Sequence, residues 1–145
     1  MTSPELDNLV RINVLKVEAA DQDEFDGLLK LGRTKLTDLA KTSLSPESQF
    51  DLAYNAAHAL ALAALRWHGF RPNENRFAVF QALAHTTDLG VDVRKILSKS
   101  HSERNRAEYQ GVIEINEGLL VELINGAQLL LAFVEKLEPV RNPNK

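Results

Sequence analysis

The polar segment 101–111 holds the densest group of residues that could do chemistry. Its reactive side chains are His101, Glu103, Arg104, Arg106, Glu108 and Tyr109, with Asn105 among them. An arginine offers a fixed fork of donors that matches a phosphate, and a histidine exchanges protons near neutral pH. These residue types suggest phosphate or nucleotide chemistry, whereas a solvated helix end with ion pairs would explain the same pattern without any ligand.

Helical geometry decides which of these side chains can meet. At 100° per residue, His101, Arg104 and Glu108 share one face, while Arg104 and Tyr109 are about 140° apart on an ideal helix. Arg104 and Tyr109 can therefore converge only if something other than a regular helix brings them together. A helix end near Gly111 could let Tyr109 swing back, or a second copy of the chain could supply its own Arg104.

Other catalytic signatures are missing from the sequence. The chain has no cysteine, which excludes disulfides, thiolate catalysis and cysteine-ligated zinc. Its four histidines form no His-Glu-x-x-His pattern, and there is no Walker loop and no Gly-x-Gly-x-x-Gly loop. We expect neither a metal nor a cofactor.

Apolar stripes with the period of a helix run through the chain and break at short polar turns. The approximate bounds of the predicted helices are 3–17, 21–40, 45–68, 76–87, 93–108 and 117–137. The helix over 45–68 is apolar nearly all round and must be buried on several sides. The only strand-like stretch is 112–115. The pattern predicts an all-α protein, a helical bundle with four main helices and an additional short N-terminal helix.

Length, composition and charge fit one small domain. With 145 residues and no Gly/Ser/Pro-rich linker, we expect a single domain over 1–145, a core over about 21–138 and a polar tail over 139–145. The sequence begins without a basic segment followed by an apolar run, so we expect no signal peptide. We also expect no stretch to approach the ~20 apolar residues of a membrane span, and therefore a cytoplasmic location. Segment 66–109 carries 8 Lys/Arg against 5 Asp/Glu in a chain of net charge −3. This local excess is weak evidence for a polyanionic partner.

Two motifs resemble those of a known family. Arg104-Asn105-x-x-x-Tyr109 resembles the signature of HEPN domains, in which an arginine, usually followed by a polar residue, precedes a histidine by four to six positions. Tyr109 stands where that histidine would be. The alanine-rich helix with Tyr54 and His58, followed by Gly-Phe-Arg-Pro and a further helix, is similar to the matching region of the family. The resemblance covers roughly 25–134, and the chain also resembles an uncharacterised actinobacterial subgroup of the family.

The resemblance implies an antiparallel four-helix bundle, often dimeric, with paired motifs facing each other at the interface. Many members are metal-independent endoribonucleases of toxin-antitoxin, CRISPR or RNA-stress systems. Other members are partners of minimal nucleotidyltransferases, and others bind nucleotides without catalytic activity. The implied partners are a second copy, RNA or a nucleotide, and a minimal nucleotidyltransferase. The resemblance implies Arg104, Asn105 and Tyr109 as catalytic residues, and we add His101 as their neighbour on the same helix. The implied RNA- or nucleotide-binding residues are Arg104, Arg106, Lys99 and Arg71.

The identity of the proton-transfer group is the open question. A tyrosine, with a pKa of ~10, stays protonated at neutral pH and mainly donates a hydrogen bond. His101, one turn before Arg104, is the candidate replacement for the missing imidazole. His58 pairs with Tyr54 at i, i+4 and is more simply a hydrogen-bonded core histidine. A non-enzymatic partner protein and a plain helical scaffold remain the alternatives to an RNA-acting enzyme.

Overall fold

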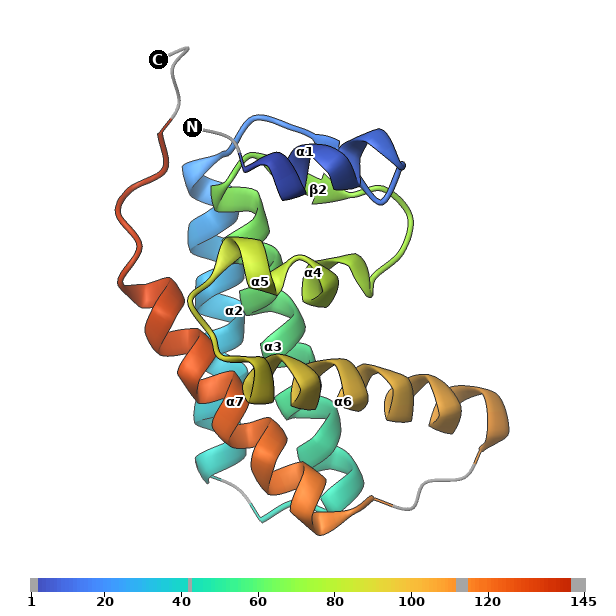
Figure 1. The fold of residues 1–145 in the computed structure, drawn as a ribbon. Helices are drawn as coiled ribbons and strands as arrows, with labels where there is room; N and C mark the ends of the chain where they lie inside the picture. Colours follow the sequence, from blue (N-terminus) through green and yellow to red (C-terminus); the bar gives the residue numbers. More distant parts are fainter. Residues whose placement is uncertain (1–2, 42, 112–114, 142–145) are drawn as a thin grey trace.

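The computed structural model describes residues 3–41, 43–111 and 115–141, and these are mostly helical (Figure 1). The elements are α1 Pro4–Arg11, β1 Leu15–Val17, α2 Gln22–Lys41, α3 Pro46–Trp67, β2 Phe70–Pro72, α4 Ala78–Gln81, α5 Leu83–Thr86, α6 Val91–Gln110 and α7 Glu117–Glu135. The predicted all-α class is confirmed. The strand-like stretch 112–115 lies, apart from its last residue, outside the described residues.

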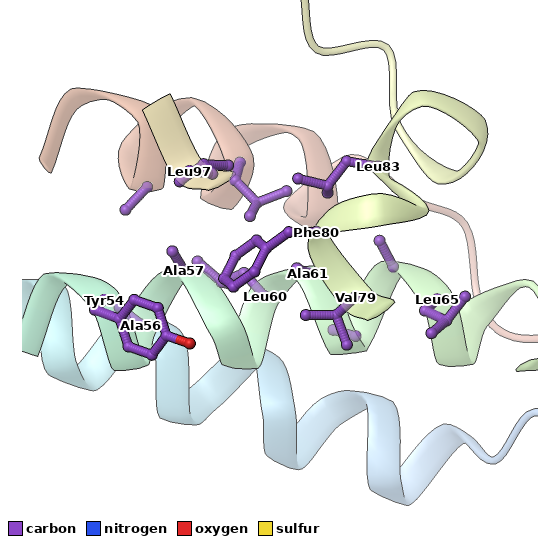
Figure 2. Packing of buried hydrophobic residues seen from close by; sticks show 14 of the residues in the cluster. Tyr54, Ala56, Ala57, Leu60, Ala61, Leu65, Val79, Phe80, Leu83 and Leu97 are labelled. Carbon is purple, nitrogen blue, oxygen red and sulfur yellow. The ribbon is translucent and has the colours of Figure 1, made fainter. Parts of the chain in front are cut away.

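Helix α3 is the central element, with α2 and α7 packed along it (Figure 1). Gly32 of α2 allows the two helices to approach closely, because a Cβ built on it would lie only 2.5 Å from Leu60 Cγ of α3. On the side of α3 that faces away from α2, Phe80, Leu83 and Leu97 cover the core (Figure 2). Burial on both sides explains why this helix is apolar nearly all round.

The bounds of α3 follow from local sequence, as predicted. The side chain of Ser45 caps the helix by accepting a hydrogen bond from the Ser48 amide at 3.2 Å, and Pro46 occupies the first helical turn. Beyond the C-terminal end, Gly69 takes a left-handed conformation with φ of 87°. The chain then turns into β2.

Two predicted helices have different bounds in the structure. The N-terminal helix does not reach Val17 but ends at Arg11, because Asn13 adopts φ of 64° and the chain continues as β1. β1 pairs antiparallel with β2, with Lys16 opposite Arg71. The predicted helix over 76–87 is two short helices, α4 and α5, which meet at Ala82. The break lets the segment bend over α3 and bury both halves.

A buried arginine connects segment 18–24, which leads into α2, to the end of α3. Arg66 is 2% exposed; its guanidinium pairs with Glu24 and donates to the carbonyls of Glu18, Ala19 and Phe70. The Glu24 carboxylate also pairs with Arg71. This cluster fixes the start of α2 against β2, since a buried guanidinium is tolerated only when its donors are satisfied.

Among the described helices, α7 is long and apolar enough to cross a membrane by length and composition alone. The expectation that no segment approaches this limit was therefore wrong for α7. A core helix meets the same criterion, and α7 buries Leu123, Ala127 and Leu130 in contact with the rest of the fold.

Candidate functional site

Helix α6 carries the polar segment away from the core. Figure 1 shows it lying across α3 and α7, with its C-terminal half projecting outward. The residues it buries are Leu97, Ser100 and His101. The helix continues to Gln110, where Gly111 ends it in a left-handed conformation with φ of 66°. The polar face therefore begins where α6 leaves the core.

His101 is the centre of a hydrogen-bonded cluster between α3 and α6. Its Nδ1 lies 2.7 Å from Tyr54 Oη, and its Nε2 lies 3.1 Å from Asn105 Nδ2. If the Asn105 amide nitrogen donates to Nε2, the ring proton lies on Nδ1; the donor and acceptor roles of both ring nitrogens depend on the tautomer. The rings of Phe77 and Phe80 lie 5.1 and 5.9 Å from the imidazole, centre to centre. The cluster thus fixes the orientation of the His101 ring.

Arg104 lies over the same tyrosine. Its Cζ is 4.7 Å from the centre of the Tyr54 ring, a cation–π distance. Its Nη1 is 3.2 Å from Glu108 Oε1, one turn further along α6. The Arg104 side chain keeps 21% of its surface exposed, so the guanidinium is held in place yet remains accessible. The two contacts hold the guanidinium in one orientation, with Glu108 as its ion-pair partner.

A second histidine borders the cluster from α3. His58 Nε2 accepts a hydrogen bond of 3.4 Å from Arg76 Nε, and the His58 ring lies 6.4 Å from the Tyr54 ring. The predicted pairing of His58 with Tyr54 is thus a ring contact, while the tyrosine hydroxyl bonds to His101 instead.

Burial and nearby cations keep the two imidazoles neutral. Burial, followed by the charges of Arg76, His101 and Arg104, lowers the pKa of His58 to about 4. The pKa of His101 is also lowered, by burial first and then by Arg104 and Arg76. Burial raises the pKa of Tyr54. At neutral pH the site therefore holds a neutral imidazole beside two guanidinium groups.

A pocket of about 240 Å³ adjoins Arg104 between the start of α3 and the projecting half of α6. Its lining residues are Glu47, Phe50, Asp51, Arg104, Ala107, Glu108 and Ile115. Three of the lining residues are apolar, and three of the other four are acidic. Its chemistry differs from that of the His101 cluster, although Arg104 belongs to both.

The structure brings some of the residues predicted for the site together. His101, Arg104 and Asn105 meet through the contacts described above. Tyr109 does not join them: α6 stays helical past it, and its side chain is 89% exposed. Within a single chain, the convergence of Arg104 and Tyr109 does not occur.

The predicted binding residues outside the cluster are spread over the surface. Arg106 is exposed and lies 3.6 Å from Glu103. Lys99 is exposed on α6. Arg71 lies in β2, where Glu18 and Glu24 neutralise its charge. Of the basic residues proposed to bind nucleic acid, Arg104 is the one held within the His101 cluster.

Sequence analysis missed part of this site. The helical spacing pairs Tyr54 with His58 and does not place it beside His101, although a tyrosine in a nearly all-apolar helix usually needs a hydrogen-bond partner. Phe77 and the acids Glu47 and Asp51 gave no local signal, because only packing brings α3 and the segment before α4 next to α6.

Comparisons with known proteins give no relatives. No family model, no curated protein and no solved structure matches this chain. In the described part of the chain, no three His, Asp or Glu side chains are grouped so that they could hold a metal ion.

Proposed function

We propose that this chain is a HEPN-type helical bundle that binds single-stranded RNA at Arg104 and cleaves it without a metal. The observation that carries the proposal is the arrangement of Arg104 on the Tyr54 ring, next to a neutral imidazole that presents a basic nitrogen. Cleavage by a 2′-hydroxyl requires a cation for the phosphate and a group that accepts a proton. Arg104 and His101 supply the two.

The proposed reaction starts when RNA displaces the Asn105 amide from His101 Nε2. Nε2 takes the proton of the 2′-hydroxyl, whose oxygen attacks the adjacent phosphorus while Arg104 binds the phosphate oxygens. The bond to the 5′-oxygen breaks, and water protonates this leaving group. The products are a 2′,3′-cyclic phosphate and a 5′-hydroxyl. Tyr54 acts as a positioning residue, because it holds Nδ1 and leaves Nε2 to react.

The proposal includes a homodimer formed through α6 and α3. Tyr109 is a large aromatic side chain, 89% exposed, on the projecting half of α6, and exposed aromatic residues are enriched in protein interfaces. Light scattering at micromolar concentration is expected to give twice the mass of one chain, and Tyr109→Ala should lower this value. A strict monomer would contradict this part of the proposal.

Two arginines on the same helix provide the test of RNA binding. Arg104→Ala is expected to weaken binding of a single-stranded RNA by about 1.5–3 kcal/mol, as for the loss of a charge-assisted contact at a partly buried site. Arg106→Ala removes the same charge from an exposed position and should cost only a few tenths of a kcal/mol. Fluorescence anisotropy at constant salt measures both. Equal losses would mean diffuse electrostatic binding and would contradict a site at Arg104.

A second candidate function rests on the exposure of Tyr109. As the non-catalytic partner of a minimal nucleotidyltransferase, the chain would offer the Tyr109 hydroxyl as an acceptor: the phenol oxygen attacks the α-phosphate of a nucleoside triphosphate, and pyrophosphate leaves. An adjacent gene for such an enzyme would favour this function. A Tyr109 that stays unmodified when the two proteins are incubated with nucleoside triphosphates would argue against it.

A further inference from the structure

The pocket beside Arg104 is more acidic than a phosphate site should be. Glu47 and Asp51 lie four residues apart on α3, and Glu108 lines the same pocket from α6. Arg104, which already pairs with Glu108, is the cation in this lining. Glu47 is half-buried and Asp51 is exposed, and within residues 3–41, 43–111 and 115–141 neither carboxylate has a hydrogen-bond or ion-pair partner. This acidic lining disfavours a phosphate inside the pocket and favours a group that donates hydrogen bonds.

The volume and the apolar lining of the pocket limit which hydrogen-bond donor can bind there. The volume of about 240 Å³ is below the ~300–1,000 Å³ of pockets for drug-sized ligands. Phe50, Ala107 and Ile115 provide apolar surface. A single nucleobase has two apolar faces and a hydrogen-bonding edge, and proteins recognise unpaired RNA bases by both features. A base next to a phosphate bound at Arg104 is within reach of this pocket.

We propose that the pocket is a guanine subsite in which Glu47 and Asp51 read the base; this inference rests on the proposed binding of RNA at Arg104. Guanine presents two adjacent donors, N1–H and the N2 amino group, which match the two oxygens of a carboxylate. Adenine and cytosine place an acceptor beside their amino group, and uracil flanks its single N–H with two acceptors. Because an ionised carboxylate only accepts, it repels those acceptors.

The test uses uncleavable 2′-O-methyl uridine hexamers with one central guanine, adenine, cytosine, uracil or inosine base, and binding is followed by fluorescence anisotropy. The guanine hexamer is expected to bind at least about tenfold more tightly than those with adenine, cytosine or uracil, as for a bidentate base contact. Inosine lacks the N2 amino group and should lose most of this preference. Glu47→Gln combined with Asp51→Asn should abolish it, whereas Glu122→Gln, an exposed acid on α7, should preserve it.

The outcomes separate this inference from the function on which it rests. Equal binding of all five hexamers, lost in Arg104→Ala, would overturn the guanine subsite and leave RNA binding intact. No binding of any hexamer would overturn both. If an arginine-rich peptide bound in a manner that depends on Glu47 and Asp51, without any base preference, the pocket would be a protein-docking site and the inference would be wrong.

Discussion

His101→Ala is expected to reduce RNA cleavage by ~10²- to 10⁴-fold, the usual contribution of a general acid–base group. Tyr109→Phe is expected to leave the rate unchanged, because within one chain this side chain is exposed and lies apart from the His101 cluster, and phenylalanine keeps the ring for the proposed dimer contact. The reason for the contrast is positional: the imidazole that the motif lacks at position 109 is present one turn before Arg104, where Tyr54 and Asn105 hold its ring in place. Initial rates on a fluorescent RNA in EDTA measure both effects.

Two controls show whether the loss of activity is specific to the His101 imidazole. Because His101 is buried, circular dichroism must show that the alanine variant is folded, and added imidazole should restore part of its activity. Tyr54→Phe keeps the ring under Arg104 but removes the hydroxyl that holds Nδ1, so it should lower the rate and shift the acidic limb of the pH profile. If Tyr109→Phe abolished cleavage and His101→Ala did not, proton transfer would belong to Tyr109 and our assignment would be wrong.

Arg66→Ala is expected to lower the free energy of unfolding by ~3–5 kcal/mol, the usual cost of breaking a buried ion pair. The substitution leaves Glu24 without the partner at its Oε1 and removes the donor to three backbone carbonyls. Arg71 and its pairing with Glu24 remain, which places the effect within this range rather than above it.

An exposed ion pair supplies the matched control for Arg66. Arg33 lies 2.9 Å from Glu135 and joins α2 to α7, but both side chains are more than two-fifths exposed. Arg33→Ala should therefore cost at most ~1 kcal/mol. Urea denaturation followed by circular dichroism compares the two variants. Equal losses would show that burial does not strengthen the Arg66 cluster.

The sequence predicted the elements with strong local signals and missed those that depend on packing. The ends of α3 follow from Ser45, Pro46 and Gly69, whose preferences act within a few residues. No glycine or proline in the sequence marks the break at Ala82 between α4 and α5. β1 and β2 have three residues each, too few for a readable alternation.

The site was predictable only along one helix. The shared face of His101 and Arg104 follows from helical periodicity, and the structure has both in one cluster. The hypothesis that Tyr109 swings back at Gly111 does not hold within one chain, because α6 continues to Gln110. Tyr54 and the pocket acids Glu47 and Asp51 lie on α3, about fifty residues earlier in the chain, and no local pattern links them to α6.

The most direct measurement is incubation of the purified protein with a mixed pool of single-stranded RNA in EDTA, beside Arg104→Ala at the same concentration. The proposed function predicts fragments with 2′,3′-cyclic phosphate and 5′-hydroxyl ends from the natural protein, and intact RNA with the variant. Equal inertness of the two proteins, or equal cleavage by both, would contradict the claim that Arg104 is the centre of a metal-independent ribonuclease site.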